Sequence, residues 1–266
     1  MITHELGDVE YQESGEGDAI LFVPGSFSTG ASWRGLCAPL SERYRTITTS
    51  LCGYGQTQER RQANGAYLQD EMDVLETVLS RINAPVHLVA HSFGAWVALS
   101  LAVHRAPPLL SLTLLEPTVF HLLSLADETP LARHVQAMTD AYMAAWKQGD
   151  PRAIEPVIDF YGGPGFFQNC PPQLQAKFVA QTPTNVLDWQ TGLAEIPSTE
   201  EFSALQTRTL VVCGSNSQMA MRRCNQLLVD RLPQAQFKML DGANHFMIGT
   251  HAAQLNTWMV QHMQSH

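Results

Sequence analysis

The chain has 266 residues, of which 45% are hydrophobic, and its formal net charge is −9. This length and composition are sufficient for a sizeable core in one domain that carries a large insertion. The acidic balance, without a basic stripe, argues against nucleic acids and anionic membrane surfaces as partners.

Targeting and redox features of the sequence predict a cytoplasmic protein. The first eight residues lack the basic and apolar regions of a signal peptide, and no apolar run approaches the length that spans a bilayer. The five cysteines are scattered and never spaced as Cys-x-x-Cys, which predicts reduced thiols without disulfides or a zinc site. The isolated pairs Arg60-Arg61 and Arg222-Arg223 are expected on solvated faces.

The first half of the chain alternates predicted strands with predicted helices. Apolar and β-branched runs predict strands at residues 9–12, 19–23, 44–51 and 86–89. The spacing of apolar residues predicts helices at residues 33–40, 67–82 and 95–103. A further strand is predicted at 112–115, and it stops at Glu116-Pro117.

The alternation lapses after Pro117. Asp127 is expected to cap a long helix that Gly149 closes, and Asp150-Pro151 is expected to open another helix. Ser198-Thr-Glu-Glu201 has the spacing of a capping box at the start of a short helix. We therefore predict a mainly helical lid over residues 118–204, inserted into a core formed by residues 1–117 and 205–266.

Strand and helix signals alternate again in the last part of the chain. Strands are predicted at 209–213 and 236–240, and helices at 218–232 and 252–263. Such alternation implies an α/β fold, with a mostly parallel sheet covered by helices on both faces. Ligands of these sheets bind outside the carboxyl ends of the strands. The candidate residues Ser26, Ser92, Glu116 and His245 all fall at those ends.

Residues 86–96 have the sequence Val-His-Leu-Val-Ala-His-Ser-Phe-Gly-Ala-Trp. A strand, a tight turn with Ser92 at its apex, and a helix form the context of a nucleophile elbow. The positions two residues before and after the serine must be small, and Gly94 meets this requirement while Ala90 replaces the usual glycine. The following helix directs its positive end at Ser92. The alternative is a strand–helix turn with an incidental serine.

The elbow resembles that of serine hydrolases of the α/β-hydrolase superfamily. The resemblance covers residues 19–117 and 205–262, and it implies the α/β-hydrolase fold with a lid insertion. Similar members place their catalytic histidine in a Gly-x-x-His turn after the last strand, which here contains His245. A serine hydroxyl needs such a base within hydrogen-bond reach.

The third member of the implied triad departs from the common pattern. Superfamily members usually carry an aspartate three residues past the glycine that ends the penultimate strand, and here that position is Ser217. Serine can cap the following helix, but it cannot stabilise an imidazolium as a carboxylate does. Glu116 is the expected substitute, because some members, including a subset of haloalkane dehalogenases, carry the acid after the earlier strand. A salt bridge or a lid contact remains the alternative role for Glu116, and Asp241 and Asp188 remain alternative acids.

The resemblance also implies an oxyanion hole, which requires backbone donors aimed at the developing charge. We expect the N–H groups of Phe93 and of Ser26, in the turn Pro24-Gly25-Ser26-Phe27. Substrate contacts are expected from four aromatic side chains, namely Phe27, Trp146, Phe160 and Phe246. The lid aromatics have an alternative role in packing the lid helices against one another.

The sequence thus predicts a serine hydrolase for a small, largely apolar ester, thioester or lactone, with Ser92 as nucleophile, His245 as base and Glu116 as its orienting acid. A serine at the elbow argues against dehalogenase and epoxide hydrolase chemistry, which needs a carboxylate nucleophile. A carbon–carbon bond hydrolase or lyase and a non-catalytic binding protein remain alternatives. The predicted partner is a small-molecule substrate; no metal or organic cofactor is expected, and a homodimer is left open.

Overall fold

The computed structural model describes residues 1–4, 7–62, 67–194 and 198–265. Within these ranges seven strands form one sheet in the order β3-β5-β4-β6-β7-β8-β9. Its strands are β3 (Gln12–Ser14), β4 (Ala19–Val23), β5 (Arg45–Thr48), β6 (Val86–His91), β7 (Leu109–Leu115), β8 (Thr209–Gly214) and β9 (Ala235–Leu240). Only β3 runs antiparallel to its neighbour in this sheet. The predicted mostly parallel sheet is confirmed.

The predicted strand at residues 9–12 is wrong, because two separate strands occupy its ends. β1 (Ile2–His4) and β2 (Gly7–Val9) form an antiparallel pair of their own, and β3 begins only at Gln12. The main chain of Glu10 bonds to side chains instead of to a strand. Its N–H donates to Thr57 Oγ1 at 3.0 Å, and its carbonyl accepts from Thr49 Oγ1 at 2.8 Å.

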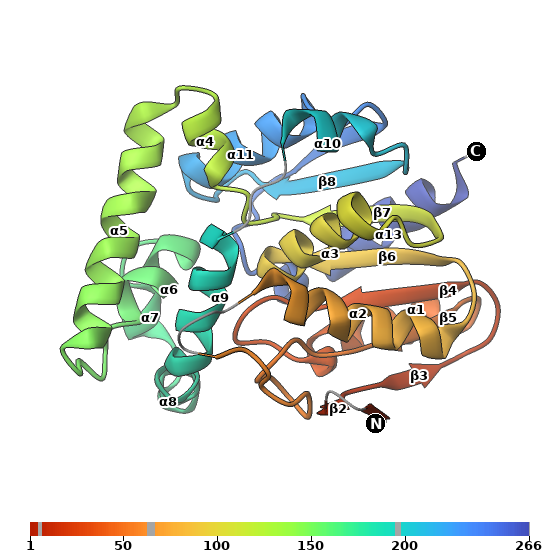
Figure 1. Ribbon diagram of the computed structural model, residues 1–266, viewed down its shortest axis with the longest axis horizontal. Helices are drawn as coiled ribbons and strands as arrows, with labels where there is room; N and C mark the ends of the chain where they lie inside the picture. Colours follow the sequence, from red (N-terminus) through yellow and green to blue (C-terminus); the bar gives the residue numbers. More distant parts are fainter. Residues whose placement is uncertain (5–6, 63–66, 195–197, 266) are drawn as a thin grey trace.

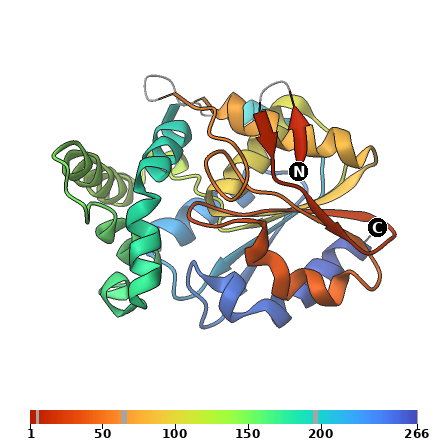
Figure 2. The same cartoon turned by 90° about the horizontal axis from the view of Figure 1, so that it is seen from below.

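Helices cover both faces of the sheet (Figure 2). One face packs against η1 (Gly30–Trp33), α1 (Arg34–Leu40) and α13 (Ala252–Gln264), and the other against α2 (Leu68–Ile82), α3 (Ser92–Arg105) and α11 (Met219–Val229). In β4, Ile20 and Phe22 join the first layer while Leu21 and Val23 join the second. A strand covered on both faces buries consecutive residues, which explains the uninterrupted apolar runs.

Except for the last one, which lies alongside β8, the helices between β7 and β8 stand beside the carboxyl ends of the strands (Figure 1). They are α4 (His121–Leu125), α5 (Thr129–Lys147), α6 (Glu155–Gly162), α7 (Phe166–Asn169), α8 (Pro172–Ala180), α9 (Thr182–Ala194) and α10 (Thr199–Ala204). At the two ends of this segment, α4 contacts α11 and α10 contacts α3. Of the predicted lid, residues 195–197 lie outside the described residues.

Two of the predicted helix starts in the lid are wrong. No side chain caps α5, since Asp127 lies before its N-cap residue with a φ of 56°, whereas Gly149 closes the helix with a φ of 78° as expected. No helix starts at Asp150-Pro151, because Asp150 Oδ1 accepts a bond from the N–H of Arg152 and forms a turn. The next helix begins at Glu155.

The capping box at the start of α10 is confirmed. The N–H of Ser198 donates to Glu201 Oε2 at 2.7 Å, and the N–H of Glu201 donates to Ser198 Oγ at 3.2 Å. Both bonds satisfy N–H groups that have no partner inside the helix.

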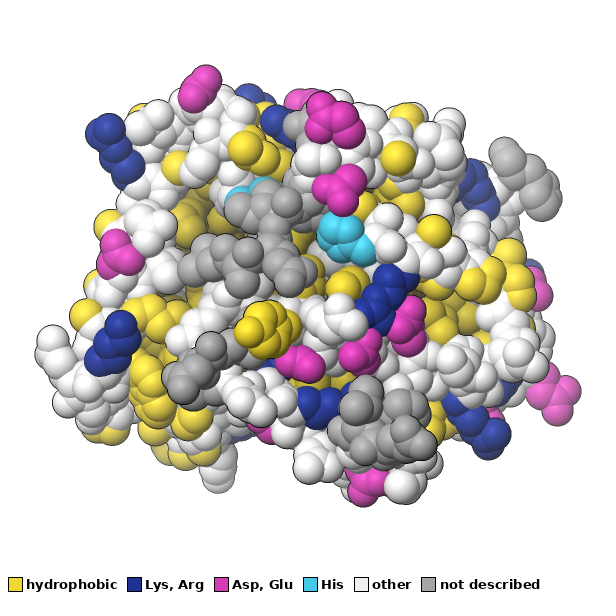
Figure 3. Space-filling model, viewed as in Figure 1, with side chains coloured by type: hydrophobic (Ala, Val, Ile, Leu, Met, Phe, Trp, Pro, Cys, Tyr) yellow, Lys and Arg dark blue, Asp and Glu magenta, His cyan; other side chains and the backbone are white. Residues whose placement is uncertain are grey.

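On the face shown in Figure 3, Lys and Arg side chains lie scattered among Asp and Glu side chains. Among the described helices, none combines the length and the apolar character that a bilayer crossing requires. The five cysteines are all free, and four of them are buried.

Candidate active site

Ser92 stands at the sharp turn between β6 and α3. Its φ of 56° lies in the left-handed region, which a non-glycine residue adopts only under the constraint of its surroundings. A Cβ on Gly94 would lie 2.1 Å from the carbonyl oxygen of Pro24, and a Cβ on Gly25 would lie 2.6 Å from Ser92 Cβ. Both positions therefore require glycine, and the turn of residues 24–27 presses directly against Ser92.

His245 joins Ser92 to Glu116 through its two ring nitrogens. Its Nε2 lies 2.8 Å from Ser92 Oγ, and its Nδ1 lies 2.6 Å from Glu116 Oε2. An ionised carboxylate only accepts hydrogen bonds, so Nδ1 carries the proton and Nε2 is free to accept the proton of Ser92. All three side chains are at least 94% buried.

Glu116 follows β7 and is held by several donors at the end of β8. Its φ is 46°, a strained value that turns the chain away from the sheet before Pro117. Its Oε1 accepts from Ser217 Oγ at 2.5 Å and from the N–H of Gly214 at 2.7 Å. Ser217 occupies the position where superfamily members usually carry the triad aspartate. Its hydroxyl donates a hydrogen bond to Glu116, the carboxylate that contacts His245 in this chain.

The two alternative acids lie elsewhere. Asp241 is exposed, and its Oδ1 accepts from Ser215 Oγ at 3.3 Å. Asp188 bonds to Arg61, whose Nη1 lies 2.6 Å from its Oδ1. Only Glu116 of these three carboxylates contacts His245.

The electrostatic environment keeps Glu116 ionised. Burial by itself raises the pKa of this carboxyl, but hydrogen bonds from His245, Ser217 and Gly214 outweigh burial and hold the pKa below its ordinary value. In His91, burial and the neighbouring His245 lower the pKa to about 3. His91 is therefore neutral near pH 7, and its Nε2–H donates to the carbonyl of His245 at 2.9 Å.

The turn that carries Ser26 is bonded to α9, a helix of segment 118–204. Ser26 Oγ donates to Asp188 Oδ2 at 2.5 Å, and the next residue, Phe27, has a φ of 61°. Because its hydroxyl already donates to Asp188, the backbone N–H is the hydrogen-bond donor that Ser26 has left to offer a ligand. The N–H groups of Ser26 and of Phe93, at the start of α3, are the two predicted donors of the oxyanion hole.

Asp188, on α9, belongs to a largely buried cluster of charged and polar groups that the sequence did not indicate, with Ser26 and Glu59 partly exposed. We define the Asp188 cluster as Ser26, Tyr54, Glu59, Arg61, Glu71 and Asp188. Tyr54 donates to Asp188 Oδ2 at 2.6 Å. Arg61 Nη2 donates to Glu59 at 2.8 Å, and its Nη1 lies 3.0 Å from Glu71 Oε1 in a charge contact.

The position of Arg61 corrects the expectation of a solvated Arg60-Arg61 pair, since the Arg61 side chain is fully buried. Burial alone would lower the pKa of Arg61, but the carboxylates of Glu71 and Asp188 raise it above its ordinary value. The guanidinium therefore stays charged and compensates the buried carboxylates around it.

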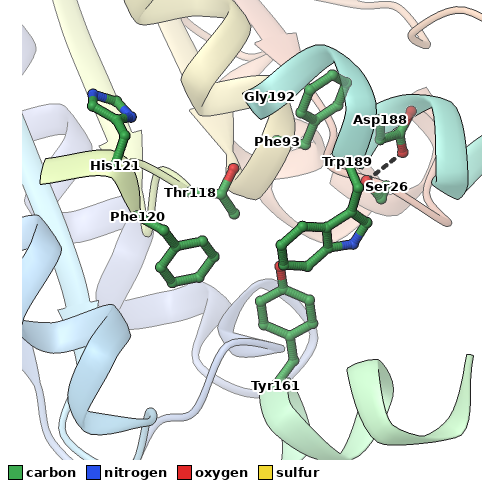
Figure 4. A pocket seen from close by; sticks show the side chains of 9 residues that line it. All are labelled: Ser26, Phe93, Thr118, Phe120, His121, Tyr161, Asp188, Trp189 and Gly192. Atoms are coloured by element: carbon green, nitrogen blue, oxygen red, sulfur yellow. Dashed lines mark hydrogen bonds between the residues drawn. The ribbon is translucent and has the colours of Figure 1, made fainter. Parts of the chain in front are cut away.

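Two cavities adjoin the reacting groups. The large chamber has a volume of about 350 Å³ and is lined by Ser26, Phe27, Ser28, Ser32, His91, Ser92, Ile158, Tyr161, Phe166, Leu174, Phe178, His245, Phe246, Ile248 and Gly249. The small chamber, about 40 Å³, is lined by Ser26, Phe93, Thr118, Phe120, His121, Tyr161, Asp188, Trp189 and Gly192 (Figure 4). Ser26 and Tyr161 line both chambers and so mark their boundary.

Of the four predicted substrate-contact residues, Phe27 and Phe246 line the large chamber. Phe160 and Trp146 line neither chamber, which corrects the prediction for both. Phe160 packs with Phe120 and Tyr161 at ring-centroid distances of 5.8 and 5.3 Å, and Trp146 packs against the hydrophobic core. These contacts agree with the alternative role, in which the aromatic side chains of segment 118–204 pack its helices.

Sequence reasoning did not single out Tyr161 for the site. Its ring stacks on that of His245, with a centroid distance of 4.3 Å and an interplanar angle of 18°. Nothing in the sequence distinguishes Tyr161 from the other lid aromatics, because the contact joins residues that are far apart along the chain. In the described ranges, no group of three or more His, Cys, Asp and Glu side chains could hold a metal ion.

Comparison with known proteins identifies similar sequences. A model of the alpha/beta hydrolase family matches residues 20–258. The chain is 24% identical over 252 residues to 2-hydroxymuconate semialdehyde hydrolase of Pseudomonas sp. (strain CF600), with 91% of this chain and 85% of that protein covered. It is 32% identical over 110 residues to a probable lysophospholipase, BODYGUARD 2, of Arabidopsis thaliana, with 39% and 23% covered. The chain spans less than a quarter of the length of the first curated relatives that it matches.

Solved structures share the fold over the whole chain. A thermophilic esterase from Thermogutta terrifontis superposes with a TM-score of 0.74 at 20% sequence identity. The match covers 98% of this chain and 97% of the esterase. At this level of identity the likeness concerns the fold.

Proposed function

Because the chain belongs to the alpha/beta hydrolase family, we propose that it is a serine hydrolase that cleaves a small, largely apolar ester or a related thioester or lactone. The observation that carries this proposal is the hydrogen-bonded series from Ser92 Oγ through His245 to Glu116, with links of 2.8 and 2.6 Å. This arrangement has the geometry that converts a serine hydroxyl into a nucleophile.

In the proposed reaction Ser92 Oγ attacks the substrate carbonyl carbon while His245 Nε2 takes the hydroxyl proton. Glu116 stabilises the imidazolium that forms and keeps the ring in the required tautomer. The N–H groups of Ser26 and Phe93 bind the oxyanion of the tetrahedral intermediate. His245 then protonates the leaving oxygen, and water, activated by the same histidine, hydrolyses the acyl-enzyme.

The substrate class follows from the walls of the two chambers. The large chamber is lined mainly by aromatic and aliphatic side chains, among them Phe27, Leu174 and Phe178. Helices of segment 118–204 supply several of these walls, which supports a role for this segment as a lid over the site. Such a cavity favours an apolar small molecule.

A second candidate function is carbon–carbon bond hydrolysis with the same three residues. The similarity to 2-hydroxymuconate semialdehyde hydrolase, over 91% of this chain, favours it. Assay of simple alkyl esters beside vinylogous β-diketones distinguishes the two activities. Ester turnover that exceeds diketone cleavage supports the first proposal, and the reverse order supports the second.

The proposal is tested by labelling with a fluorophosphonate probe, followed by peptide mass spectrometry. We expect rapid labelling at Ser92 in the wild type, no labelling in Ser92→Ala, and a loss of ester turnover in the same variant. Undiminished turnover in a folded Ser92→Ala protein would contradict the proposal. Absence of labelling with several probe sizes, together with ligand binding, would indicate a non-catalytic binding protein.

A further inference from the structure

We propose that the two chambers assign opposite ends of the substrate: a short acyl group enters the small chamber, and a bulky apolar alcohol or thiol group occupies the large one. The inference rests on the proposed function and narrows its substrate class. The enzyme would then prefer short-chain acyl esters of large apolar alcohols over long-chain acyl esters of small alcohols.

The position of His245 determines where the leaving group lies. In acyl transfer the base that deprotonates the serine later donates that proton to the leaving oxygen, so the leaving group must lie within hydrogen-bond reach of His245 Nε2. His245 and Ser92 both line the large chamber, and neither lines the small one. The alcohol part of the ester therefore extends into the large chamber.

The oxyanion donors lie beside the space that is left for the acyl group. The carbonyl oxygen must point at the N–H groups of Ser26 and Phe93, and both residues line the small chamber. The acyl substituent is the remaining group on the carbonyl carbon, and with the alcohol part in the large chamber it enters the space between Trp189, Thr118 and Gly192 (Figure 4).

The volumes of the chambers set the sizes of the two groups. The small chamber has a volume of about 40 Å³. A chamber of this size holds only a small group of a few heavy atoms. The large chamber, at about 350 Å³, accepts a much larger group.

Charge in the small chamber restricts the acyl group further. Asp188 lines this chamber, and its carboxylate oxygens already accept bonds from Ser26, Tyr54 and Arg61. An acyl chain that ends in a second carboxylate would meet this negative charge without a free cation to pair with. We therefore expect uncharged short acyl groups.

A pair of isomeric esters tests the orientation. Octyl acetate and methyl nonanoate have the same atoms, but the long chain lies on the alcohol side in the first and on the acyl side in the second. We expect kcat/KM for octyl acetate to exceed that for methyl nonanoate by at least about tenfold, because a pocket rejects excess methylenes by this order of magnitude. Equal rates, or faster cleavage of methyl nonanoate, overturn the inference and leave the serine hydrolase proposal intact.

Two glycines provide matched variants. A Cβ on Gly192 would lie 3.9 Å from Phe93 Cε2, an ordinary contact, and a Cβ on Gly249 would meet nothing within 4 Å. Both glycines lie in helices, where alanine is tolerated. Gly192→Ala is expected to lower the ratio of octyl butyrate to octyl acetate turnover about fivefold or more, whereas Gly249→Ala should leave that ratio within about twofold because it lines the other chamber.

Thermal unfolding and Ser92 labelling of both variants serve as controls for folding and for reactivity. An unchanged ratio in a folded, labelled Gly192→Ala protein overturns the inference. If the wild type labels at Ser92 but cleaves neither octyl ester, the inference also fails while the reactive serine stands. If the wild type neither labels nor cleaves any ester, the proposed function itself fails, and the inference fails with it.

Discussion

Two buried carboxylates bond to residues of the candidate site, Glu116 to His245 and Asp188 to Ser26, and they differ in their other partners. Glu116 bonds to His245, a side chain that is neutral in its resting tautomer and becomes charged when it takes a proton. Asp188 bonds to Arg61, which carries its charge permanently, and to the hydroxyl groups of Tyr54 and Ser26. Both carboxylates are at least 98% buried.

The difference in partners implies a difference in when each carboxylate contributes. In the proposed reaction the attraction between Glu116 and His245 grows as the imidazolium forms, so it would stabilise the transition state more than the ground state. The attraction between Asp188 and Arg61 is the same throughout, so it stabilises the folded lid and the Ser26 turn. Burial of an acid near a reacting group therefore does not by itself make the acid catalytic.

The largest expected effect is that of Glu116→Gln on catalysis. We expect kcat to fall by about 10³- to 10⁴-fold, because an amide at this position no longer stabilises the imidazolium and favours the wrong tautomer. Ester turnover and the rate of fluorophosphonate labelling measure the effect. Asp241→Asn is the matched control, with an expected change of less than about twofold, because Asp241 is exposed and does not bond to His245. A Glu116→Gln enzyme that keeps a tenth or more of its activity would assign the acid elsewhere.

Asp188→Asn tests the other side of the comparison, with its main effect on stability. Removal of one partner of a buried ion pair costs about 3–5 kcal/mol, which urea unfolding measures. We expect kcat/KM to fall only about tenfold, less than the loss of an oxyanion donor, because Ser26 keeps its N–H but loses its hydroxyl partner. A stable variant with a 10³-fold loss of activity would reverse the two roles.

The pH dependence of stability provides a third test. Since the native pKa of Glu116 lies below its ordinary value of 4.5, its contribution to stability is fully present above that value. As the pH falls below 4.5 and through the lowered native pKa, the contribution is lost. Melting temperatures between about pH 3 and pH 6 should therefore decline less steeply toward acid in Glu116→Gln than in the wild type. Parallel curves would show that Glu116 does not titrate in this way.

His91→Phe is expected to have the smallest effect. Phenylalanine keeps an aromatic ring beside His245 but loses the bond from His91 Nε2 to the His245 carbonyl. The expected loss of stability is about 1 kcal/mol, typical of one hydrogen bond. Because His91 has a pKa of about 3, the acidic limb of the kcat/KM profile should stay in place above pH 4. A shift of that limb would mean that His91 titrates in the working range.

The predicted α/β-hydrolase fold is confirmed, and the reasons are local. Uninterrupted apolar runs indicate buried parallel strands, because helices pack against both faces of the sheet and bury the side chains on each face. The elbow is encoded in the eleven residues 86–96, where a strand, a small-residue turn and a helix follow one another. The contact between Glu116 and His245 was predictable from the family resemblance, because Glu116 ends its strand before Pro117 and Ser217 leaves no acid at the family's common position.

Tertiary structure alone decided the surroundings of these residues. The lid helices carry aromatic side chains on several faces, so the sequence could not tell that Tyr161 contacts His245 while Phe160 and Trp146 pack inside the lid. It also could not tell that Arg61 is buried, because its partner Asp188 lies 127 residues away. Local patterns determine strands, turns and helices, whereas the pairing of buried charges and rings depends on which segments the fold brings together.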